Sequence, residues 1–281
     1  MGNMSASQST SPFHPIRAVA IDLDGTLLAP DHSISAENRA AIEAMHDAGV
    51  EIILASGRHY QSMLPYARKL PQVRYMVSAQ GAYASDVDNQ HTLFESHLPT
   101  TDAQAAINFG LENNLSIVVY AASGLYSLTP PSQWLTYYSN LAGITPAPTT
   151  PEAILHESIF KVVYFESSER LDQIQQDPFL ANSQLYTVRS MGNIFEQADP
   201  RTNKAAALQP LIAHLGIDAS ELATFGDGNN DIPMFQLAGF SAAMDRAWPD
   251  AKAAATLVSP DGPPETSFAR AIAAMQAHYA K

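Results

Sequence analysis

The chain of 281 residues contains no cysteine. This absence excludes disulfide bonds, catalytic thiols and zinc sites built on cysteine. It fits a reducing compartment, and we expect a cytoplasmic protein. No apolar stretch approaches the roughly 20 residues that a membrane-spanning helix needs, so we expect no membrane partner.

Basic residues are also scarce, with 15 Lys and Arg against 28 Asp and Glu and a formal net charge of -13 at pH 7. This balance argues against nucleic acid as a partner. An anionic ligand would need local help from a lysine, backbone amides or a metal. With 46% hydrophobic residues the chain is expected to be globular, while its oligomeric state, monomer or small homo-oligomer, is left open.

The ends of the chain alternate between strand and helix patterns. Strands are predicted at 16–23, 50–56 and 75–82, separated by helices at 35–50 and 60–70, the second interrupted by Pro65. Ser35 is a plausible N-cap and Gly49 a terminator of the first helix. The alternation of helix and strand patterns resumes at residue 203. Helices are predicted at 203–217, 230–239, 248–255 and 264–279, and strands at 222–227, 240–244 and 256–259. This order predicts an α/β fold with a doubly wound, Rossmann-like parallel sheet.

The middle of the chain follows a different pattern. Hairpins are predicted at 116–128, with a Ser-Gly turn, and at 185–198, with a Gly-Asn turn. Helices are expected at 102–114, 132–142 and 170–180, and a surface loop at 145–153. We therefore predict a mobile tail at 1–15, a core at 16–82 and 196–281, and an inserted α+β domain at 83–195.

Polar groups stand at the ends of several predicted strands. Asp22 and Asp24 follow the first strand, Ser56 and Gly57 the second, and Asp227 a late one. Ligands gather at the carboxyl ends of strands in such sheets, so these groups are expected at one rim. Carboxylates there suit Mg²⁺, which prefers oxygen ligands.

Donors for a phosphoryl group accompany these acids. Ser56 offers a hydroxyl, Gly57 a turn amide, and Lys204 an ammonium near the start of a predicted helix. Phosphoryl transfer depends largely on positioning and charge neutralisation, and a carboxylate can itself be the nucleophile.

Each motif also has a simpler interpretation. An EF-hand beginning at Asp22 would need Gly and Glu where Leu27 and Ser33 stand. "GDGNND" has Asp231 in place of the third glycine of a dinucleotide fingerprint. A serine after a strand is often a helix cap, and Lys204 taken alone would be a solvated lysine that the helix dipole disfavours.

Taken together, "DLDGT", "SGR", "NK" and "GDGNND" resemble the four motifs of the haloacid dehalogenase superfamily of phosphohydrolases. The insertion resembles the C2-type cap, subtype B, of the Cof-like members. The resemblance implies a haloacid dehalogenase core that carries an inserted α+β cap for substrate specificity.

The resemblance also implies roles for individual residues. Asp22 would attack phosphorus, and Asp24 would act as acid and base. Mg²⁺ would be held by the side chains of Asp22 and Asp227 and the backbone carbonyl of Asp24. The phosphate-binding residues implied are Ser56, Gly57, Lys204 and Asn230, with Asp231 behind them orienting Lys204 or a metal-bound water.

Four further positions are less defined. Gln80 stands where Cof-like members often have Asn, and Asp245 where they often have Gly. Arg58 could bind substrate or form a structural ion pair. Lys161, unusual in an apolar strand, could face the substrate or lie at a strand edge.

The resemblance therefore implies a Mg²⁺-dependent phosphatase that acts on small phosphorylated metabolites through an aspartyl-phosphate. The substrate expected first is a sugar phosphate, and pyridoxal phosphate or flavin mononucleotide is the second expectation. The alternatives are a hexose-phosphate phosphomutase and a non-catalytic metabolite-binding protein on the same fold.

Overall fold

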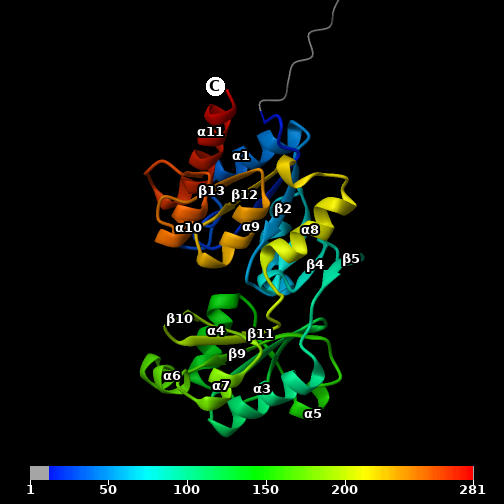
Figure 1. Ribbon diagram of the computed structural model, residues 1–281, viewed down its shortest axis with the longest axis vertical. Helices are drawn as coiled ribbons and strands as arrows, with labels where there is room; N and C mark the ends of the chain where they lie inside the picture. Colours follow the sequence, from blue (N-terminus) through cyan, green and yellow to red (C-terminus); the bar gives the residue numbers. More distant parts are fainter. Residues whose placement is uncertain (1–12, 281) are drawn as a thin grey trace, which may run out of the picture. The chain divides into compact units, whose positions relative to one another are not determined.

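The computed structural model describes residues 13–280 (Figure 1). These residues form two compact units, one made of 13–54, 70–74 and 212–280 and the other of 55–69 and 75–211. Most of the predicted tail, residues 1–12, lies outside the described part. Phe13, within that predicted tail, is buried, and its carbonyl accepts from Ile16 N at 2.7 Å. Between residues 13 and 280 no helix combines the length and the apolar character needed to cross a membrane.

The strands, named in chain order, are β1 (Ala18–Ile21), β2 (Glu51–Ala55), β3 (Val73–Ser78), β4 (Tyr83–Asp86), β5 (Thr92–Glu95), β6 (Ser116–Ala121), β7 (Gly124–Ser127), β8 (Ala147–Pro148), β9 (Ile159–Phe165), β10 (Tyr186–Met191), β11 (Ile194–Ala198), β12 (Leu222–Gly226), β13 (Phe240–Ala243) and β14 (Leu257–Val258). The α-helices are α1 (Ala36–Asp47), α2 (Tyr60–Ala67), α3 (Thr100–Glu112), α4 (Gln133–Ala142), α5 (Pro151–Ile154), α6 (Ser168–Ile174), α7 (Pro178–Asn182), α8 (Lys204–His214), α9 (Ile232–Leu237), α10 (Pro249–Ala254) and α11 (Ser267–Tyr279).

One sheet has eight strands in the order β14-β13-β12-β1-β2-β3-β4-β5. β1 pairs in parallel with both β2 and β12, with Ile21 opposite Leu54 and Phe225. β4 and β5 add an antiparallel edge. The parallel centre and its helical crossovers confirm the predicted doubly wound α/β fold.

The start and the end of α1, the first crossover helix, are determined by residues next to it in the sequence. The Ser35 hydroxyl accepts from Asn38 N at 3.1 Å, and Gly49 follows the helix with φ +84°, as predicted for a cap and a terminator. Asn38 is fully buried in α1. Its amide donates to Leu27 O at 2.9 Å and its Oδ1 accepts from Ala269 N at 3.0 Å, tying α1 to α11, against which it packs (Figure 1).

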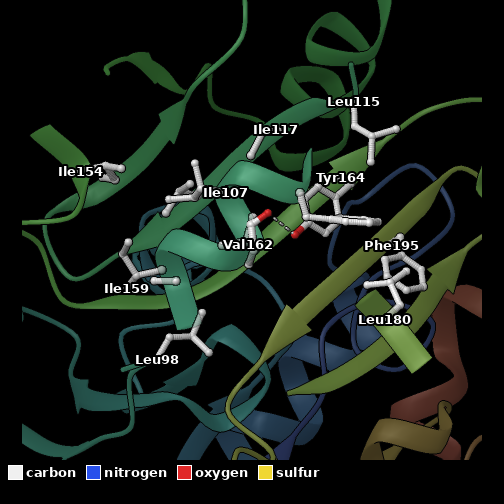
Figure 2. Close-up of a cluster of buried hydrophobic side chains, with 14 of the residues drawn as sticks. Leu98, Ile107, Leu115, Ile117, Ile154, Ile159, Val162, Tyr164, Leu180 and Phe195 are labelled. Atoms are coloured by element: carbon white, nitrogen blue, oxygen red, sulfur yellow. Dashed lines mark hydrogen bonds between the residues drawn. The ribbon is translucent and has the colours of Figure 1, made fainter. Parts of the chain in front are cut away.

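The second sheet has six strands in the order β10-β11-β9-β6-β7-β8 and confirms the α+β character of the middle block. Alternate residues of β6 face opposite sides. Ile117 and Val119 join a cluster with α3, whereas Val118 and Tyr120 join one with α4. Figure 2 shows the first cluster, in which the Tyr164 hydroxyl donates to the buried carbonyl of Ala106 at 2.7 Å.

Four local predictions differ from the structure. α2 continues through Pro65, although a proline at this position has no N–H to donate to the carbonyl of Gln61. The predicted loop 145–153 contains β8 and α5, because Tyr126 of β7 pairs with Ala147. The helix predicted at 170–180 is two helices, broken where Asp177 caps the second. The turn between β6 and β7 uses residues 122 and 123, since Gly124 already belongs to the strand.

Candidate active site

Three carboxylates gather at the carboxyl ends of the adjacent strands β1 and β12. Asp22 follows β1, and Asp227 and Asp231 follow β12; one oxygen from each lies within 4.8 Å of the others. Asp22 and Asp231 are buried, with exposed fractions of 5% and 0%. Parallel neighbours end at the same edge, which is why Asp22 meets Asp227 and Asp231 although they are far apart in the chain.

Asp231 holds the loop after β12 in place. Its Oδ2 accepts hydrogen bonds from the backbone N–H groups of Asp227 and Gly228, both at 2.9 Å. Hydrogen bonds to an ionised carboxylate are stronger than neutral ones, so this carboxylate stiffens the turn that carries Asp227. The predicted role of Asp231 in orienting Lys204 or a metal-bound water stays a prediction.

The cluster fits a bound cation. Carboxylates this close repel one another, and Asp22 and Asp231 are buried, which makes their ionised forms costly to desolvate. Their oxygens are the ligands that hard divalent cations prefer. The donor set is therefore consistent with a metal site formed by Asp22 and Asp227, with Asp231 next to them.

The side chain of Asp24 lies apart from the three clustered carboxylates and is about half exposed. It is 3.6 Å from Nδ1 of His32, a partner that the sequence did not suggest. His32 sits in a tight turn with φ +60°, where its amide donates to Ala29 O at 2.8 Å. A solvent-accessible carboxylate beside an imidazole suits a group that must exchange protons.

The remaining predicted residue of this loop, Asn230, is exposed. Its side-chain amide lies over Gly228, where a Cβ would overlap the Asn230 Oδ1. A side-chain amide can both donate and accept hydrogen bonds, which suits the predicted contact of Asn230 with a phosphate.

In the second unit, the segment after β2 forms a compact turn. The Ser56 hydroxyl, 2% exposed, accepts from Arg58 N at 3.2 Å, and Gln80 N donates to Ser56 O at 3.3 Å. The Gln80 amide also packs on Gly57. A Cβ added at Gly57 would lie 2.6 Å from the Gln80 Nε2. Gln80 has φ +63°, a conformation that Asn adopts more readily, so its use here carries some backbone strain.

Lys204 is the first residue of α8 and is completely buried. Gly81, with φ +94°, packs directly on the backbone of Asn203 and Lys204, where any side chain would overlap the Asn203 carbonyl. The "QGA" stretch after β3 therefore sets the position of the lysine, although it lies more than 120 residues before it.

Arg58 and Lys161 both reach across the second unit. Arg58 donates to Leu141 O at 3.1 Å, in the last turn of α4, where helix carbonyls lack partners and a positive charge is favourable. Lys161 is 2% exposed, and its Nζ lies 2.5 Å from Glu196 Oε2. Burial acts to lower the pKa of Lys161, but the Glu196 carboxylate together with the side chains of Tyr120 and Tyr186 outweighs it, and the pKa lies above its usual value.

Asp245 has a structural environment. Its Oδ1 accepts from Ser267 Oγ and from Arg270 Nη2, both at 3.1 Å. These bonds link the end of β13 to α11, which explains why a carboxylate is accommodated at this position.

Comparisons with known proteins agree with this architecture. Residues 19–272 match the haloacid dehalogenase-like hydrolase family. An HMP-PP phosphatase of Cronobacter sakazakii is 27% identical over 240 residues, covering 83% of this chain and 85% of that protein. The match confirms the superfamily to which the sequence motifs pointed.

Solved structures show the same fold. A haloacid dehalogenase-like hydrolase from Bacteroides thetaiotaomicron superposes with a TM-score of 0.82 at 23% identity, covering 92% of this chain and 99% of that one. The subclass IIB sugar phosphatase BT4131 gives a TM-score of 0.79 at 22% identity, with 94% and 99% covered.

Proposed function

We propose that this chain, which belongs to the haloacid dehalogenase-like hydrolase family and is a phosphatase of small phosphorylated metabolites, uses Mg²⁺ and forms an aspartyl-phosphate on Asp22. The observation that carries the proposal is the cluster of Asp22, Asp227 and Asp231 at the carboxyl ends of β1 and β12, in which Asp22 and Asp231 are buried. A cluster of three carboxylates at strand ends, with two of them buried, is typical of a functional site.

In the first step an Asp22 oxygen bonds to phosphorus, and the bond from phosphorus to the leaving oxygen breaks. Asp24 gives its proton to that oxygen, so the product leaves as an alcohol. In the second step Asp24 takes a proton from water, and the resulting hydroxide attacks phosphorus and releases Asp22 and inorganic phosphate. The half-exposed position of Asp24 supports both proton transfers.

Mg²⁺ would be held by the side chains of Asp22 and Asp227 and by the backbone carbonyl of Asp24. When bound, it neutralises negative charge on the phosphoryl group and the carboxylates. Asp231 keeps the loop of Asp227 rigid through its two amide hydrogen bonds.

The phosphoryl oxygens would be bound by the residue set Ser56, Gly57, Lys204 and Asn230. Ser56 supports this assignment best, because its Oγ accepts from Arg58 N and, among residues 13–280, donates to no other group. Its hydroxyl hydrogen is therefore available for an anionic ligand.

For the substrate we propose a sugar phosphate, as in the related sugar phosphatase BT4131, with a phosphorylated heterocycle as the second choice, as in the related HMP-PP phosphatase. Residues 83–195 would act as the cap that selects the leaving group.

The test is phosphate release from a panel of sugar phosphates, pyridoxal phosphate and flavin mononucleotide, with and without Mg²⁺. We expect release only with the metal, and a loss of at least about 1,000-fold in Asp22→Asn, because the nucleophile is removed. Asp250→Asn, which changes an exposed carboxylate of α10, is the matched control and should keep full activity.

Acid quenching during turnover, followed by mass spectrometry, should find phosphate on the peptide that contains Asp22. Wild-type protein that releases no phosphate from any substrate, or full activity in Asp22→Asn, would contradict the proposal.

A further inference from the structure

A buried ion pair lies beside the turn that follows β2. Lys161 of β9 and Glu196 of β11 meet at 2.5 Å, and the Lys161 Nζ also lies 4.3 Å from the centre of the Tyr120 ring of β6. Lys161 is opposite Tyr120 and Ala198 in the sheet register, which brings these groups to one face. A buried ammonium is stable only when its donors are satisfied.

The third partner of this ammonium is the carbonyl of Gly57, which accepts from Nζ at 3.2 Å. The Glu196 carboxylate, the Gly57 carbonyl and the face of the Tyr120 ring thus provide a partner for each of the three N–H donors. Lys161 has no further donor for a ligand, and its side chain is 2% exposed.

The Gly57 carbonyl and the Arg58 N–H belong to the same peptide group. The carbonyl accepts from Lys161, and the N–H donates to Ser56 Oγ at 3.2 Å. An ammonium at the oxygen polarises the peptide and strengthens the hydrogen bond that its N–H donates. The chain of contacts therefore runs from Lys161 through one peptide group to the Ser56 hydroxyl.

The neighbouring residues hold the same turn. Arg58 is tied to Leu141 O at 3.1 Å, and His59 Nε2 to Ala121 O at 2.9 Å. Three consecutive residues are thus each bound to a different element, namely β9, α4 and β6. Of these three contacts, only the one from Lys161 is made to the peptide group whose N–H donates to Ser56 Oγ.

We propose that Lys161 is a positioning residue: it orients the peptide between Gly57 and Arg58 so that the Ser56 hydroxyl directs its hydrogen toward a phosphoryl oxygen. The proposal rests on the proposed function, since it assigns Ser56 to phosphate binding. It differs from a direct contact between Lys161 and the variable part of the substrate, because a positioning residue affects every phosphate ligand equally.

The test uses Lys161→Met/Glu196→Met, which removes both charges together and so leaves no unpaired buried carboxylate. We expect the inhibition constant for inorganic phosphate to rise about tenfold, the loss of roughly one hydrogen bond to a charged group. The KM of chemically different substrates should rise by the same factor, with a smaller change in kcat. Lys69→Met, at an exposed lysine of the same unit, is the control.

A mutant cycle with Ser56 separates positioning from general damage. In a Ser56→Ala background the double methionine change should leave the phosphate inhibition constant within about twofold, because the hydroxyl it acts through is gone. An undiminished tenfold effect in that background would overturn the inference. If the methionine pair does not fold, Lys161→Gln/Glu196→Gln carries the same expectation, since glutamine is too short to replace the ammonium at Gly57.

The outcomes also separate this inference from the function on which it rests. Wild-type protein that neither releases nor binds phosphate contradicts the proposed function. An active wild type whose methionine variant keeps its phosphate inhibition constant, or changes KM for one substrate alone, overturns only the role of Lys161.

Discussion

At the scale of single residues, Gly25 sets the space available to the carboxylate cluster. It has φ +75°, and a Cβ at this position would overlap the carboxylate of Asp227. We predict that Gly25→Ala displaces Asp227 and weakens Mg²⁺ binding by about 10- to 100-fold, as changes next to metal ligands commonly do. Titration calorimetry with Mg²⁺ measures this directly.

Gly49→Ala separates backbone strain from the overlap with Asp227. Gly49 has a comparable φ of +84°, but nothing lies within 4 Å of the Cβ it would gain. This variant should lose about 1 kcal/mol of stability and keep its Mg²⁺ affinity. Equal losses of affinity in the two variants would mean that backbone strain, and not the Asp227 contact, is responsible.

At the scale of elements, the start of α2 depends on a neutral histidine. His59 Nδ1 accepts from Gln61 N at 3.3 Å as the N-cap, while Nε2 donates to Ala121 O at 2.9 Å. The ring is 1% exposed, and burial lowers the pKa of His59 from 6.5 to about 4. A proton on Nδ1 would remove the acceptor of the cap and place a charge in the interior.

This lowered pKa makes stability depend on pH. Between pH 6.5 and 4 the unfolded chain binds a proton that the native His59 does not. The contribution of His59 to the free energy of unfolding is therefore fully present above pH 6.5. It falls by about 3 kcal/mol as the pH drops to 4. Urea unfolding of wild type and His59→Gln across this range should show a steeper fall in wild type.

His156→Gln, which changes an exposed histidine of the same unit, should follow wild type. A wild-type slope equal to that of His59→Gln would show that His59 titrates normally in the folded protein.

At the scale of the whole molecule, stability is expected to depend on divalent cations. The protein has a formal net charge of -13 and buries carboxylates in one cluster, so a cation bound there relieves repulsion in the native state only. At a free Mg²⁺ concentration of roughly 100 times its dissociation constant, the free energy of unfolding should rise by about 2.7 kcal/mol. Thermal unfolding with Mg²⁺, and again after chelation, measures the change.

General screening of the acidic surface also stabilises the folded chain, so NaCl at matched ionic strength is the reference. Asp227→Asn should abolish the difference between Mg²⁺ and NaCl, because it removes a carboxylate of the cluster. A stabilisation that persists in this variant would place the cation elsewhere.

Much of the fold follows from short patterns in the sequence. The strand before Asp22 and the helix between Ser35 and Gly49 are predictable because periodic apolar residues, caps and terminators act over a few positions. Short-range rules failed where a distant partner decides the outcome. β8 forms within a Pro- and Thr-rich stretch because β7 offers a paired edge. The break before α7 has a local cause instead, because the Asp177 side chain accepts from the nearby Phe179 N and caps the second helix.

The fold class, the family motifs and the acids at the strand ends are all predictable from the amino-acid sequence, since each depends on residues close together in the chain. Which of these groups meet depends on the tertiary packing. Asp231 joins Asp22 because β1 and β12 are neighbours, Gly81 supports Lys204, and Lys161 pairs with Glu196 and the Gly57 carbonyl. The physical reason is that the partner of a buried charge is set by non-local packing, whereas the pattern around Lys161 shows only an apolar strand with one lysine in it.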